Sequence, residues 1–274
     1  MPTADEKLTS LREILRQMAG VLVAFSGGVD STFLLQIAAE ELGNNVLAVT
    51  ERSEVEPPWD LQQATELAAA LGVRHIMLET RALDDPVFAA NPPDRCYFCK
   101  KRLFGRLQEL ARQQGLAQVV DGSIADDVDD YRPGLRAIAE LAVRSPLREA
   151  GLTKSEIRRL SKQMNMPTWD KPASPCLASR FPYNTPLTIE GIDRVRRGET
   201  FLRGLGLRQL RVRDHGTIAR IEVDSEDKGK LCEDVQAAKI TDFFKRLGYT
   251  YVCVDLTGYR TGSMNETLDF SGHG

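Results

Sequence analysis

Six consecutive residues near the start of the chain combine small size, hydroxyl groups and one carboxylate in a way that suits a phosphate. They are Ser26, Gly27, Gly28, Val29, Asp30 and Ser31. An apolar run over 21–25 precedes them, and a helix-like pattern over 32–42 follows. Glycines let backbone N–H groups approach a polyphosphate, and the first turn of a helix adds unpaired donors and a positive dipole end. This segment, which we call the phosphate loop, is therefore predicted to bind an anion.

The side chains of the phosphate loop have distinct predicted roles. We expect the hydroxyls of Ser26 and Ser31 to bond phosphate oxygens, and Asp30 to hold Mg²⁺ against them. Taken alone, Asp30 could equally be a helix N-cap, and the glycines could form an ordinary turn. No Gly-Lys-Ser/Thr sequence follows Gly28, so a Walker-type loop and transfer of the γ-phosphate are disfavoured.

The cysteines carry a second chemical signal, because three of the five lie in segments that read as loops. Cys96 and Cys99 form a Cys-x-x-Cys pair, which alone is compatible with zinc, a redox dithiol or neither, and Cys176 follows Ser-Pro. A structural zinc site would need four ligands, and a second pair is absent. Three thiolates suit a [4Fe–4S] cluster, because they leave the fourth iron open for hydrosulfide. Cys232 and Cys253 lie among apolar neighbours and are predicted to serve packing.

Alternating strand-like and helix-like segments must position these groups in the first two thirds of the chain. The strand-like runs cover 21–25, 46–50, 73–78 and 118–120, and helix-like runs cover 32–42 and 60–71. This rhythm predicts an α/β fold with a doubly wound parallel sheet, in which ligands bind beyond the carboxyl ends of the strands. The acidic run 121–127, which contains Gly122, follows the last of these strands. It is expected either to border the same crevice or to be a solvated loop.

The pattern changes after residue 183. Helices over 189–205 and 237–247, a hairpin of 209–213 and 217–223, and a strand over 250–255 predict a small C-terminal α+β domain. The proline-bearing stretch 181–186 is the expected linker. We therefore predict two domains, residues 1–183 and residues 184–274.

Charged residues alternate along the predicted hairpin. Arg211 and Arg213 share one face of the first strand, and Arg220 and Glu222 keep the same parity on the second. Guanidinium groups suit a nucleotide phosphate or a carboxylate. The competing interpretation is a solvated sheet face with cross-strand Arg–Glu pairs.

Composition limits the class of protein. The 274-residue chain has 42% apolar residues, 27% charged residues and a formal net charge of −3, as expected for a soluble globular protein. This charge gives no general attraction to nucleic acid. No apolar run approaches the roughly 20 residues of a membrane helix, and no secretory signal pattern is visible. We expect a cytoplasmic protein that binds neither nucleic acid nor membranes.

Five segments of the chain resemble a known family. The phosphate loop is similar to the Ser-Gly-Gly-x-Asp-Ser pyrophosphate loop of the ATP pyrophosphatase superfamily, an adenine nucleotide alpha hydrolase-like fold whose members adenylate a substrate oxygen and release pyrophosphate. Together with this loop, the further segments that resemble the LarE family are 91–101, 122–127, 175–180 and 258–263. The segment around Cys176 is the more specific mark.

The resemblance implies an activity. LarE proteins are ATP-dependent sulfur transferases that make the nickel-pincer nucleotide cofactor of lactate racemase. For this chain it implies adenylation of a carboxylate of pyridinium-3,5-biscarboxylic acid mononucleotide and displacement of AMP by sulfur, in two rounds that give the bis-thiocarboxylic acid. The implied partners are this small-molecule mononucleotide, a sulfide source and further copies of the chain, as a hexamer.

Two mechanisms exist within the LarE family. In sacrificial members, a lone cysteine matching Cys176 gives up its sulfur and becomes dehydroalanine. In cluster-bearing members, cysteines matching Cys96, Cys99 and Cys176 ligate an iron–sulfur cluster that relays external sulfide. Because this chain has all three cysteines, we favour the [4Fe–4S] cluster and keep sacrifice of Cys176 as the alternative.

The resemblance also implies roles for residues in the predicted small domain. Related proteins place arginines from this hairpin at the mononucleotide phosphate, which implies Arg211 and Arg213. They place acids matching Glu199 and Glu222 near an intersubunit metal site.

Other groups lie beside the cysteines in the sequence. Lys101, Ser179 and Arg180 could stabilise a thiolate or the leaving adenylate, although the basic run 100–102 could equally be an exposed helix start. A tRNA-thiolating enzyme of the same superfamily is an alternative, but no strongly basic or appended RNA-binding module is visible. An amide-forming synthetase would leave the cysteines unexplained, and a nucleotide sensor would bind ATP without releasing pyrophosphate.

Overall fold

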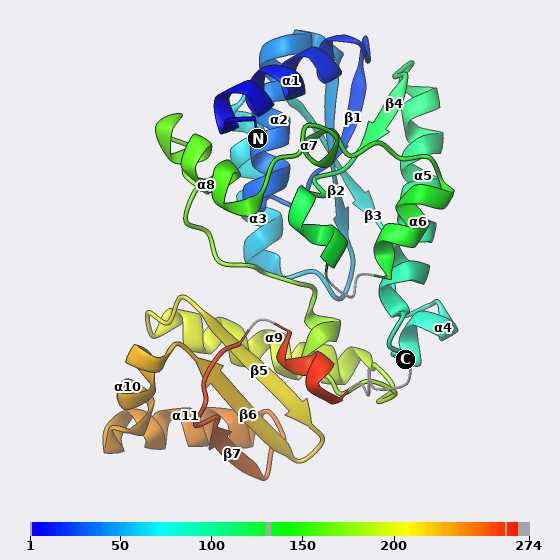
Figure 1. The fold of residues 1–274 in the computed structure, drawn as a ribbon. Coiled ribbons are helices and arrows are strands. Elements are labelled where there is room, and N and C mark those ends of the chain that lie inside the picture. The colour runs from blue at the N-terminus through cyan, green and yellow to red at the C-terminus, as the bar shows by residue number, and fades with distance from the viewer. Residues whose placement is uncertain (1, 130–132, 261, 268–274) are drawn as a thin grey trace, which may run out of the picture. The chain divides into compact units, whose positions relative to one another are not determined.

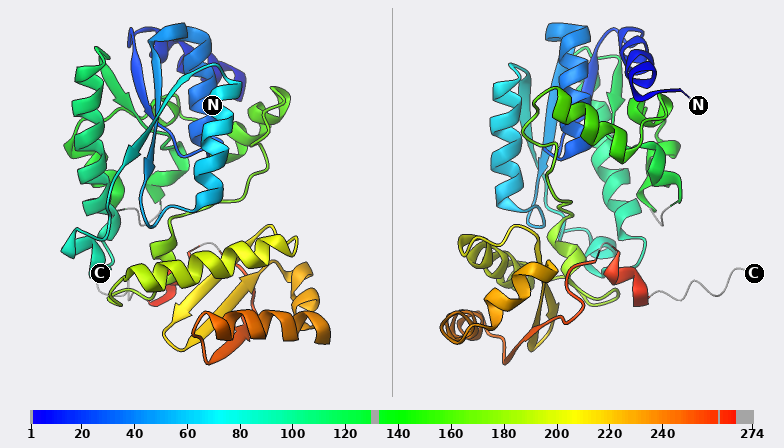
Figure 2. Two further views of the ribbon diagram at one scale, coloured as in Figure 1. Left: turned by 180° about the vertical axis from the view of Figure 1, so that it is seen from behind. Right: turned by 60° about the vertical axis from the view of Figure 1, so that its left-hand side comes forward.

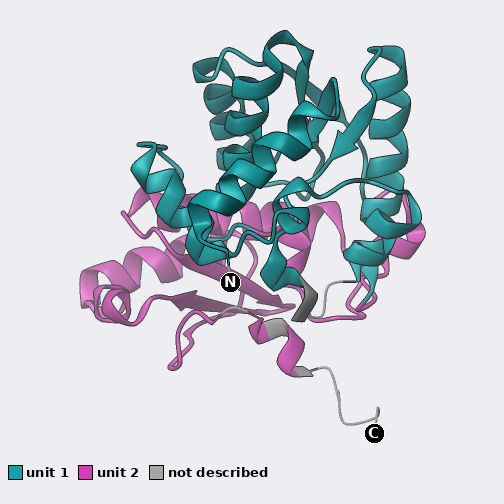
Figure 3. Ribbon diagram, turned by 45° about the horizontal axis from the view of Figure 1, so that its top comes forward, with its two compact units in different colours: residues 1–82, 94–174 teal, residues 83–93, 175–274 magenta. Residues whose placement is uncertain are grey.

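The chain folds into two compact units (Figure 3). The computed structural model describes residues 2–129, 133–260 and 262–267. Unit 1 comprises residues 1–82 and 94–174, and unit 2 comprises residues 83–93 and 175–274. The segment 83–93 belongs to unit 2 because its backbone is bonded there: Asn184 N donates to Asn91 O at 2.8 Å and Leu187 N to Ala89 O at 2.7 Å. The domain boundary predicted between residues 183 and 184 stays a prediction.

Four parallel strands form the sheet of unit 1, in the order β3-β2-β1-β4 (Figure 1). They are β1 (Val21–Ala24), β2 (Val46–Arg52), β3 (Arg74–Glu79) and β4 (Gln118–Val120). Val21 pairs with Val46 on one side and with Gln118 on the other. The predicted α/β fold with a parallel sheet is confirmed.

Helices cover both faces of this sheet. They are α1 (Ala4–Arg16), α2 (Val29–Leu42), α3 (Pro58–Ala70), α5 (Arg95–Gln113), α6 (Gly134–Glu140), α7 (Pro146–Glu149) and α8 (Lys154–Gln163). Val21 and Val23 pack in one core with residues of α1, α2, α3 and α8. Leu22 packs in a second core with residues of α5 and α6. The alternation of strand side chains thus builds two buried layers, because both faces of a doubly wound sheet are covered.

A three-stranded sheet forms the centre of unit 2. Its strands are β5 (Leu210–His215), β6 (Ile218–Val223) and β7 (Tyr251–Val254), with β5 and β6 antiparallel and β6 and β7 parallel. The helices are α4 (Pro86–Ala89), α9 (Ile189–Gly204), α10 (Lys228–Cys232) and α11 (Asp234–Arg246). Helices α9 and α11 lie against the same face of the sheet (Figure 2). The predicted small α+β unit is confirmed.

The close packing of α9 and α11 depends on one glycine. A Cβ at Gly198 would lie 3.0 Å from two ring carbons of Phe244, which is fully buried. Beside this contact, Phe201 and Phe243 stack with ring centroids 4.0 Å apart. The aromatic pairs hold the two helices over the strands that carry the charged residues of unit 2.

The packing role predicted for Cys232 and Cys253 is wrong, because both side chains are exposed. β7 lies at the edge of its sheet. The side chains of Tyr251 and Cys253, two residues apart, are both exposed on the same face of this strand. Cys232 is the last residue of the short helix α10. Among the described helices of the chain, none has the length and apolar character needed to span a membrane.

Candidate active site

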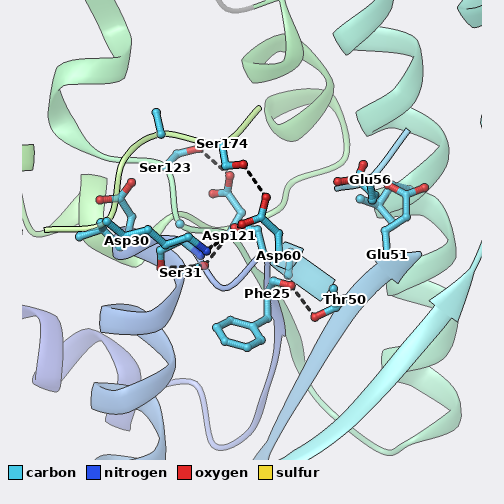
Figure 4. Close-up of a pocket in the computed structure, with 18 of the residues that line it drawn as sticks. Phe25, Asp30, Ser31, Thr50, Glu51, Glu56, Asp60, Asp121, Ser123 and Ser174 are labelled. Atoms are coloured by element: carbon cyan, nitrogen blue, oxygen red, sulfur yellow. Dashed lines mark hydrogen bonds and ion pairs between the residues drawn. The ribbon is translucent and has the colours of Figure 1, made fainter. Parts of the chain in front are cut away.

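A cavity of about 460 Å³ opens at the carboxyl ends of β1, β2 and β4 (Figure 4). It lies in unit 1, at the point where the chain order reverses between β1 and its two neighbours. Its lining includes the phosphate loop after β1, Thr50 and Glu51 of β2, and residues 121–123 after β4. This position is the usual ligand site of an open α/β sheet.

The phosphate loop turns directly into α2. Gly28 is the N-cap of that helix, so α2 begins at Val29, three residues earlier than predicted. Asp30 therefore lies in the first turn, and its alternative role as N-cap is excluded. The hydroxyl oxygens of Ser26 and Ser31 are 3.1 Å apart. The helix start and both hydroxyls line the cavity, an arrangement that suits an anion. We call this end of the cavity the anion site, and phosphate binding there stays a prediction.

Two glycines allow backbone segments to meet at this loop. Gly27 has φ +66°, and a Cβ there would lie 3.2 Å from the Cα and Cβ of Ala64 in α3. A Cβ at Gly122 would lie 3.1 Å from the backbone N of Ser31. Any larger residue at either position would push a neighbouring backbone away from the anion site. A direct contact of Gly122 with a nucleotide stays a prediction.

The acidic run 121–127 borders the cavity. Asp121 and Asp127 line it and are only 5% and 4% exposed, so the interpretation of this run as a solvated loop is wrong for both. Asp121 accepts hydrogen bonds from Ser123 Oγ at 2.5 Å and from Ser145 Oγ at 2.6 Å. These bonds fix the turn after β4 beside the phosphate loop.

Asp30 presents an unused carboxylate oxygen. Its Oδ2 is 2.5 Å from Lys154 Nζ, whereas its Oδ1 is buried without a hydrogen-bond partner. Burial raises the pKa of Asp30, and the charge of Lys154 opposes that rise. A buried acceptor normally has a partner, and carboxylate oxygens are preferred ligands of Mg²⁺. The residues present therefore fit a magnesium ion between Asp30 and a bound polyphosphate.

Basic residues of the cavity were missed by sequence reasoning. Lys154, Arg158 and Lys171 line it together with Lys100. The only local signal for Lys154 is the capping box of Thr153 and Glu156, which starts α8. Nothing in the sequence around Lys171 predicts that it reaches the phosphate loop, because that contact is made across more than a hundred residues. These cations supply positive charge to a lining that also contains Asp and Glu side chains.

Two acids occupy the opposite end of the cavity from Asp30 (Figure 4). They are Glu51, at the end of β2, and Glu56, in the loop that follows. Glu51 accepts a hydrogen bond from Thr80 Oγ1 at 2.7 Å. Burial raises the pKa of Glu56 to about 8, and the charges of Glu51 and Asp60 add to the rise. With this pKa, the Glu56 carboxyl is mostly protonated at pH 7.

The raised pKa of Glu56 predicts a pH dependence of stability. Between its usual value of 4.5 and its folded value of about 8, the folded state holds the proton more tightly than the unfolded state, so stability falls as the pH rises through this range. Urea unfolding of the Glu56→Gln variant is expected to show a shallower loss between pH 5 and pH 8 than the wild type. Parallel losses in the two proteins would contradict the assignment.

The first turn of α5 carries Cys96 and Cys99, which the sequence placed in a loop. Helix α5 begins at Arg95, directly after Asp94. Residues three apart in a helix share a face, so both thiols project to the same side of this turn. Cys96 is exposed and Cys99 half-buried. A Cys-x-x-Cys pair in this position can offer two thiolates to the same metal ion or cluster.

Lys101 is turned toward α6. Its Nζ donates to Tyr97 Oη at 2.8 Å and to Glu140 Oε2 at 3.0 Å, and these bonds raise the pKa of Lys101. The Tyr97 hydroxyl in turn donates to the same carboxylate oxygen at 2.8 Å. The neighbouring Lys100, and not Lys101, is among the residues that line the cavity. A catalytic role of Lys101 stays a prediction.

Cys176 lies in unit 2, where a buried ion pair shapes its loop. It precedes the 3₁₀ turn η3 (Leu177–Arg180) and makes no capping bond through its side chain. Arg180 Nη1 donates to the carbonyl oxygens of Pro175 at 2.8 Å and Cys176 at 3.2 Å. The other side of the Arg180 guanidinium meets Glu199 of α9 at 2.8 and 2.9 Å. Arg180 therefore acts on the backbone that carries Cys176.

Loss of the Glu199 charge is expected to destabilise unit 2. Arg180 and Glu199 are both fully buried, so Glu199→Gln would leave a buried guanidinium without its counter-charge. Breaking such a pair costs about 3–5 kcal/mol. The matched control is Asp193→Asn, which breaks exposed pairs with Arg196 and Arg197 and is expected to cost less than about 1 kcal/mol. Equal unfolding free energies for the two variants in urea would contradict this account.

The charged face of the hairpin is interior. Arg211, Arg213 and Glu222 are between 1% and 4% exposed, so the interpretation as a solvated face is wrong for these residues. The cross-strand Arg–Glu pairing that it included is confirmed. Arg213 Nη2 pairs with Glu222 Oε2 at 2.7 Å, and Arg220 Nη2 lies 3.1 Å from Oε1 of the same acid. Burial, with the charge of Arg180, lowers the pKa of Arg211 to about 10.

The predicted ligand roles of these residues stay predictions. The carboxylates of Glu199 and Glu222 both form ion pairs with arginines. One of these arginines is Arg213, which pairs with Glu222. The five cysteines, all in described segments, form no disulfide. Cys96 and Cys99 belong to unit 1 and Cys176 to unit 2. In the part of the chain that the structure describes, no three His, Cys, Asp or Glu side chains are grouped as a metal site.

Comparison with known proteins adds to these observations. Residues 8–90, which contain the phosphate loop, match the asparagine synthase family. The chain is 40% identical over 269 residues to the pyridinium-3,5-bisthiocarboxylic acid mononucleotide synthase of Lactiplantibacillus plantarum, covering 98% of this chain and 97% of that protein. It is 42% identical over 264 residues to an uncharacterised protein of Synechocystis, covering 96% and 98%.

More distant relatives share part of the chain. The glutamine-hydrolysing GMP synthase of Aeropyrum pernix is 27% identical over 228 residues, which cover 72% of this chain and 42% of that enzyme. The tRNA-specific 2-thiouridylase of Desulforamulus reducens is 27% identical over 195 residues, covering 56% and 53%. The similarity to the Lactiplantibacillus synthase extends over both units. It confirms the resemblance that the phosphate loop and the cysteine segments indicated. The chain belongs to the LarE family within the ATP pyrophosphatase superfamily.

Proposed function

We propose that this protein adenylates a carboxylate of pyridinium-3,5-biscarboxylic acid mononucleotide with ATP and then replaces the activated oxygen by sulfur. The observation that carries the proposal is the anion site formed by the phosphate loop and the start of α2, in a cavity at the carboxyl ends of the strands. The named synthase that shares 40% of the sequence over nearly its whole length supports the choice of substrate.

Residues of unit 1 would carry the first step. A carboxylate oxygen of the substrate attacks the α-phosphorus of ATP, the bond from that phosphorus to the β-bridging oxygen breaks, and pyrophosphate leaves. The loop N–H groups and the hydroxyls of Ser26 and Ser31 hold the polyphosphate, while Lys154 and Arg158 balance its charge. Mg²⁺ on Asp30 Oδ1 would neutralise charge on the leaving pyrophosphate.

The second step exchanges oxygen for sulfur. Hydrosulfide attacks the acyl carbon, the carbon–oxygen bond to AMP breaks, and the sulfur loses its proton to solvent. AMP carries away the former carboxylate oxygen, and two rounds give the bis-thiocarboxylic acid. Cys176 is two residues beyond Ser174, which lines the cavity, so chain geometry keeps the two Cα atoms within about 7 Å. This reach supports a role of Cys176 at the acyl adenylate.

Three cysteines would bring the sulfur to the acyl adenylate, as ligands of a cluster or, in the alternative, by donation from Cys176 itself. Thiolates are the preferred ligands of iron–sulfur clusters, and the chain offers Cys96 and Cys99 on one helix face with Cys176 as a third ligand. A [4Fe–4S] cluster bound by them would present an open iron for hydrosulfide. The alternative is that the Cys176 thiolate attacks the acyl adenylate itself, after which its Cα proton and its Cβ–S bond are lost to leave dehydroalanine.

Pyrophosphate release with different acceptors tests the proposed reaction. The panel comprises the pyridinium dicarboxylate mononucleotide, its monocarboxylated analogue and tRNA, each with ATP and Mg²⁺. We expect rapid release with the first and none with tRNA. Failure of the mononucleotide to elicit pyrophosphate, or an equal response to tRNA, would refute the assignment. The cytoplasmic location expected from the sequence stays a proposal, as do the sulfide source and the hexamer that the family implies.

Anaerobic reconstitution separates the two sulfur sources. With the cluster, iron and sulfide analysis should find iron in the wild type and in Cys253→Ser, which removes an exposed cysteine of β7. Iron should be lost in Cys96→Ser and Cys99→Ser. Absence of iron, together with loss of the mass of hydrogen sulfide from Cys176 on turnover, would exclude the cluster.

A further inference from the structure

Three side chains of unit 1 join the phosphate loop to the segment that leads to Cys176. We call Asp60, Lys171 and Ser174 the clasp. Asp60 lies in the first turn of α3 and is 8% exposed. Its Oδ1 is 2.9 Å from Lys171 Nζ, and its Oδ2 accepts a hydrogen bond from Ser174 Oγ (Figure 4). One buried carboxylate thus holds both ends of the segment 171–174.

The clasp also contacts the phosphate loop. Lys171 Nζ donates to the carbonyl oxygen of Gly27 at 2.9 Å. Gly27 has a positive φ and packs against Ala64 of α3, one helical turn beyond Asp60. The loop peptide, helix α3 and the segment 171–174 are therefore fixed to one another at a single point.

A second attachment holds the start of this segment and the residues just before it. Arg158 of α8 donates to the carbonyl oxygens of Trp169 at 2.9 Å and Lys171 at 2.8 Å. The same helix begins with Lys154, which pairs with Asp30 in the anion site. The first attachment thus reaches Gly27 of the phosphate loop. The second reaches helix α8, whose first residue pairs with Asp30 in that loop.

We propose that the clasp is a positioning device that couples occupation of the phosphate loop to the position of Cys176. The inference deepens the proposed function and rests on it. A polyphosphate bound by the loop N–H groups fixes the peptide whose carbonyl Lys171 holds. That constraint passes through Asp60 to Ser174, and Cys176 follows two residues later. Asp60, Lys171 and Ser174 are positioning residues, because they act through the chain and not on the reacting atoms.

A purely structural link would behave differently. Removing such a link would lower stability to the same extent with and without nucleotide. A coupling device instead makes the reactivity of Cys176 depend on nucleotide, and coupled sites typically change one another's equilibria about 5- to 150-fold. The nucleotide dependence of Cys176 is therefore the informative readout.

Alkylation of Cys176 by iodoacetamide, followed peptide by peptide with mass spectrometry, measures this dependence. The full-length protein is used with Mg²⁺, with and without a non-hydrolysable ATP analogue at saturation for each variant. In the wild type the analogue is expected to slow alkylation by at least about fivefold. Ser174→Ala and Asp60→Asn are expected to reduce that protection to less than about twofold. Ser174→Thr keeps a hydroxyl for Asp60 and is expected to restore it.

Each outcome decides the inference. Full protection in Ser174→Ala, or equal loss in Ser174→Thr, overturns it, as does a wild type whose Cys176 is alkylated at the same rate with and without the analogue. The assay needs no turnover. A protein that shows protection but releases no pyrophosphate with the mononucleotide would therefore refute the proposed function while leaving the clasp in place.

Discussion

Asp30→Ala is expected to abolish both pyrophosphate release and sulfur transfer. Asp30 supplies the buried Oδ1 that we assign to Mg²⁺, and its other oxygen holds Lys154 at 2.5 Å. Loss of one group that stabilises developing charge typically costs about 10²–10³-fold in rate, and here the anion site loses its metal ligand and the order of a cation together. Both activities are measured with the mononucleotide, ATP and Mg²⁺ under saturating conditions.

A matched control and a second variant guard this result against misfolding. Asp193→Ala removes an exposed acid of unit 2 and should retain both activities. Asp30→Asn preserves the shape of the side chain and should show the same double loss as Asp30→Ala, with an unchanged unfolding transition. Pyrophosphate release within about tenfold of the wild type in either Asp30 variant would remove Asp30 from the mechanism.

Cys176→Ala is expected to separate the two half-reactions. The described lining of the cavity comes from unit 1 and does not include Cys176. Pyrophosphate release in the first turnover, which precedes sulfur transfer, should therefore stay within about threefold of the wild type. Arg180 holds the backbone of the loop at Pro175 and Cys176, so removal of the thiol should leave the loop intact. Thiocarboxylate formation, followed by mass spectrometry, should fall below detection.

The exposed cysteine of β7 provides the control for Cys176. Cys253→Ala should leave both pyrophosphate release and thiocarboxylate formation at wild-type levels. A parallel fall of both activities in Cys176→Ala would contradict the division of labour between the two units. Retained sulfur transfer in Cys176→Ala would show that Cys176 is neither a required cluster ligand nor the sulfur donor.

The parts of the fold that depend on local pattern could be predicted. Strands β1, β2 and β4 contain apolar runs that are largely buried, and β4 has the predicted bounds of 118 and 120. The phosphate loop was identifiable because glycines and hydroxyls between a strand and a helix have few other uses. Local chemistry and chain order were sufficient for these features.

Features that depend on contacts distant in sequence could not be predicted. Lys154 and Lys171 reach the phosphate loop from more than a hundred residues away, and no local pattern indicates such a contact. The alternation of Arg211 and Arg213 predicted their shared face, but their burial depends on how the rest of unit 2 covers that face. The exposure of Cys253 likewise follows from the edge position of β7, which sequence order alone does not give.

The most direct test of the central claim follows an oxygen atom. The mononucleotide is prepared with heavy oxygen in its carboxylates and incubated with the enzyme, ATP, Mg²⁺ and a sulfide source without air. Adenylation predicts that each thiocarboxylate formed is matched by one AMP carrying a heavy oxygen on its phosphorus, with unlabelled pyrophosphate. Heavy oxygen in orthophosphate together with ADP, or thiocarboxylate formed with unlabelled AMP, would contradict the account.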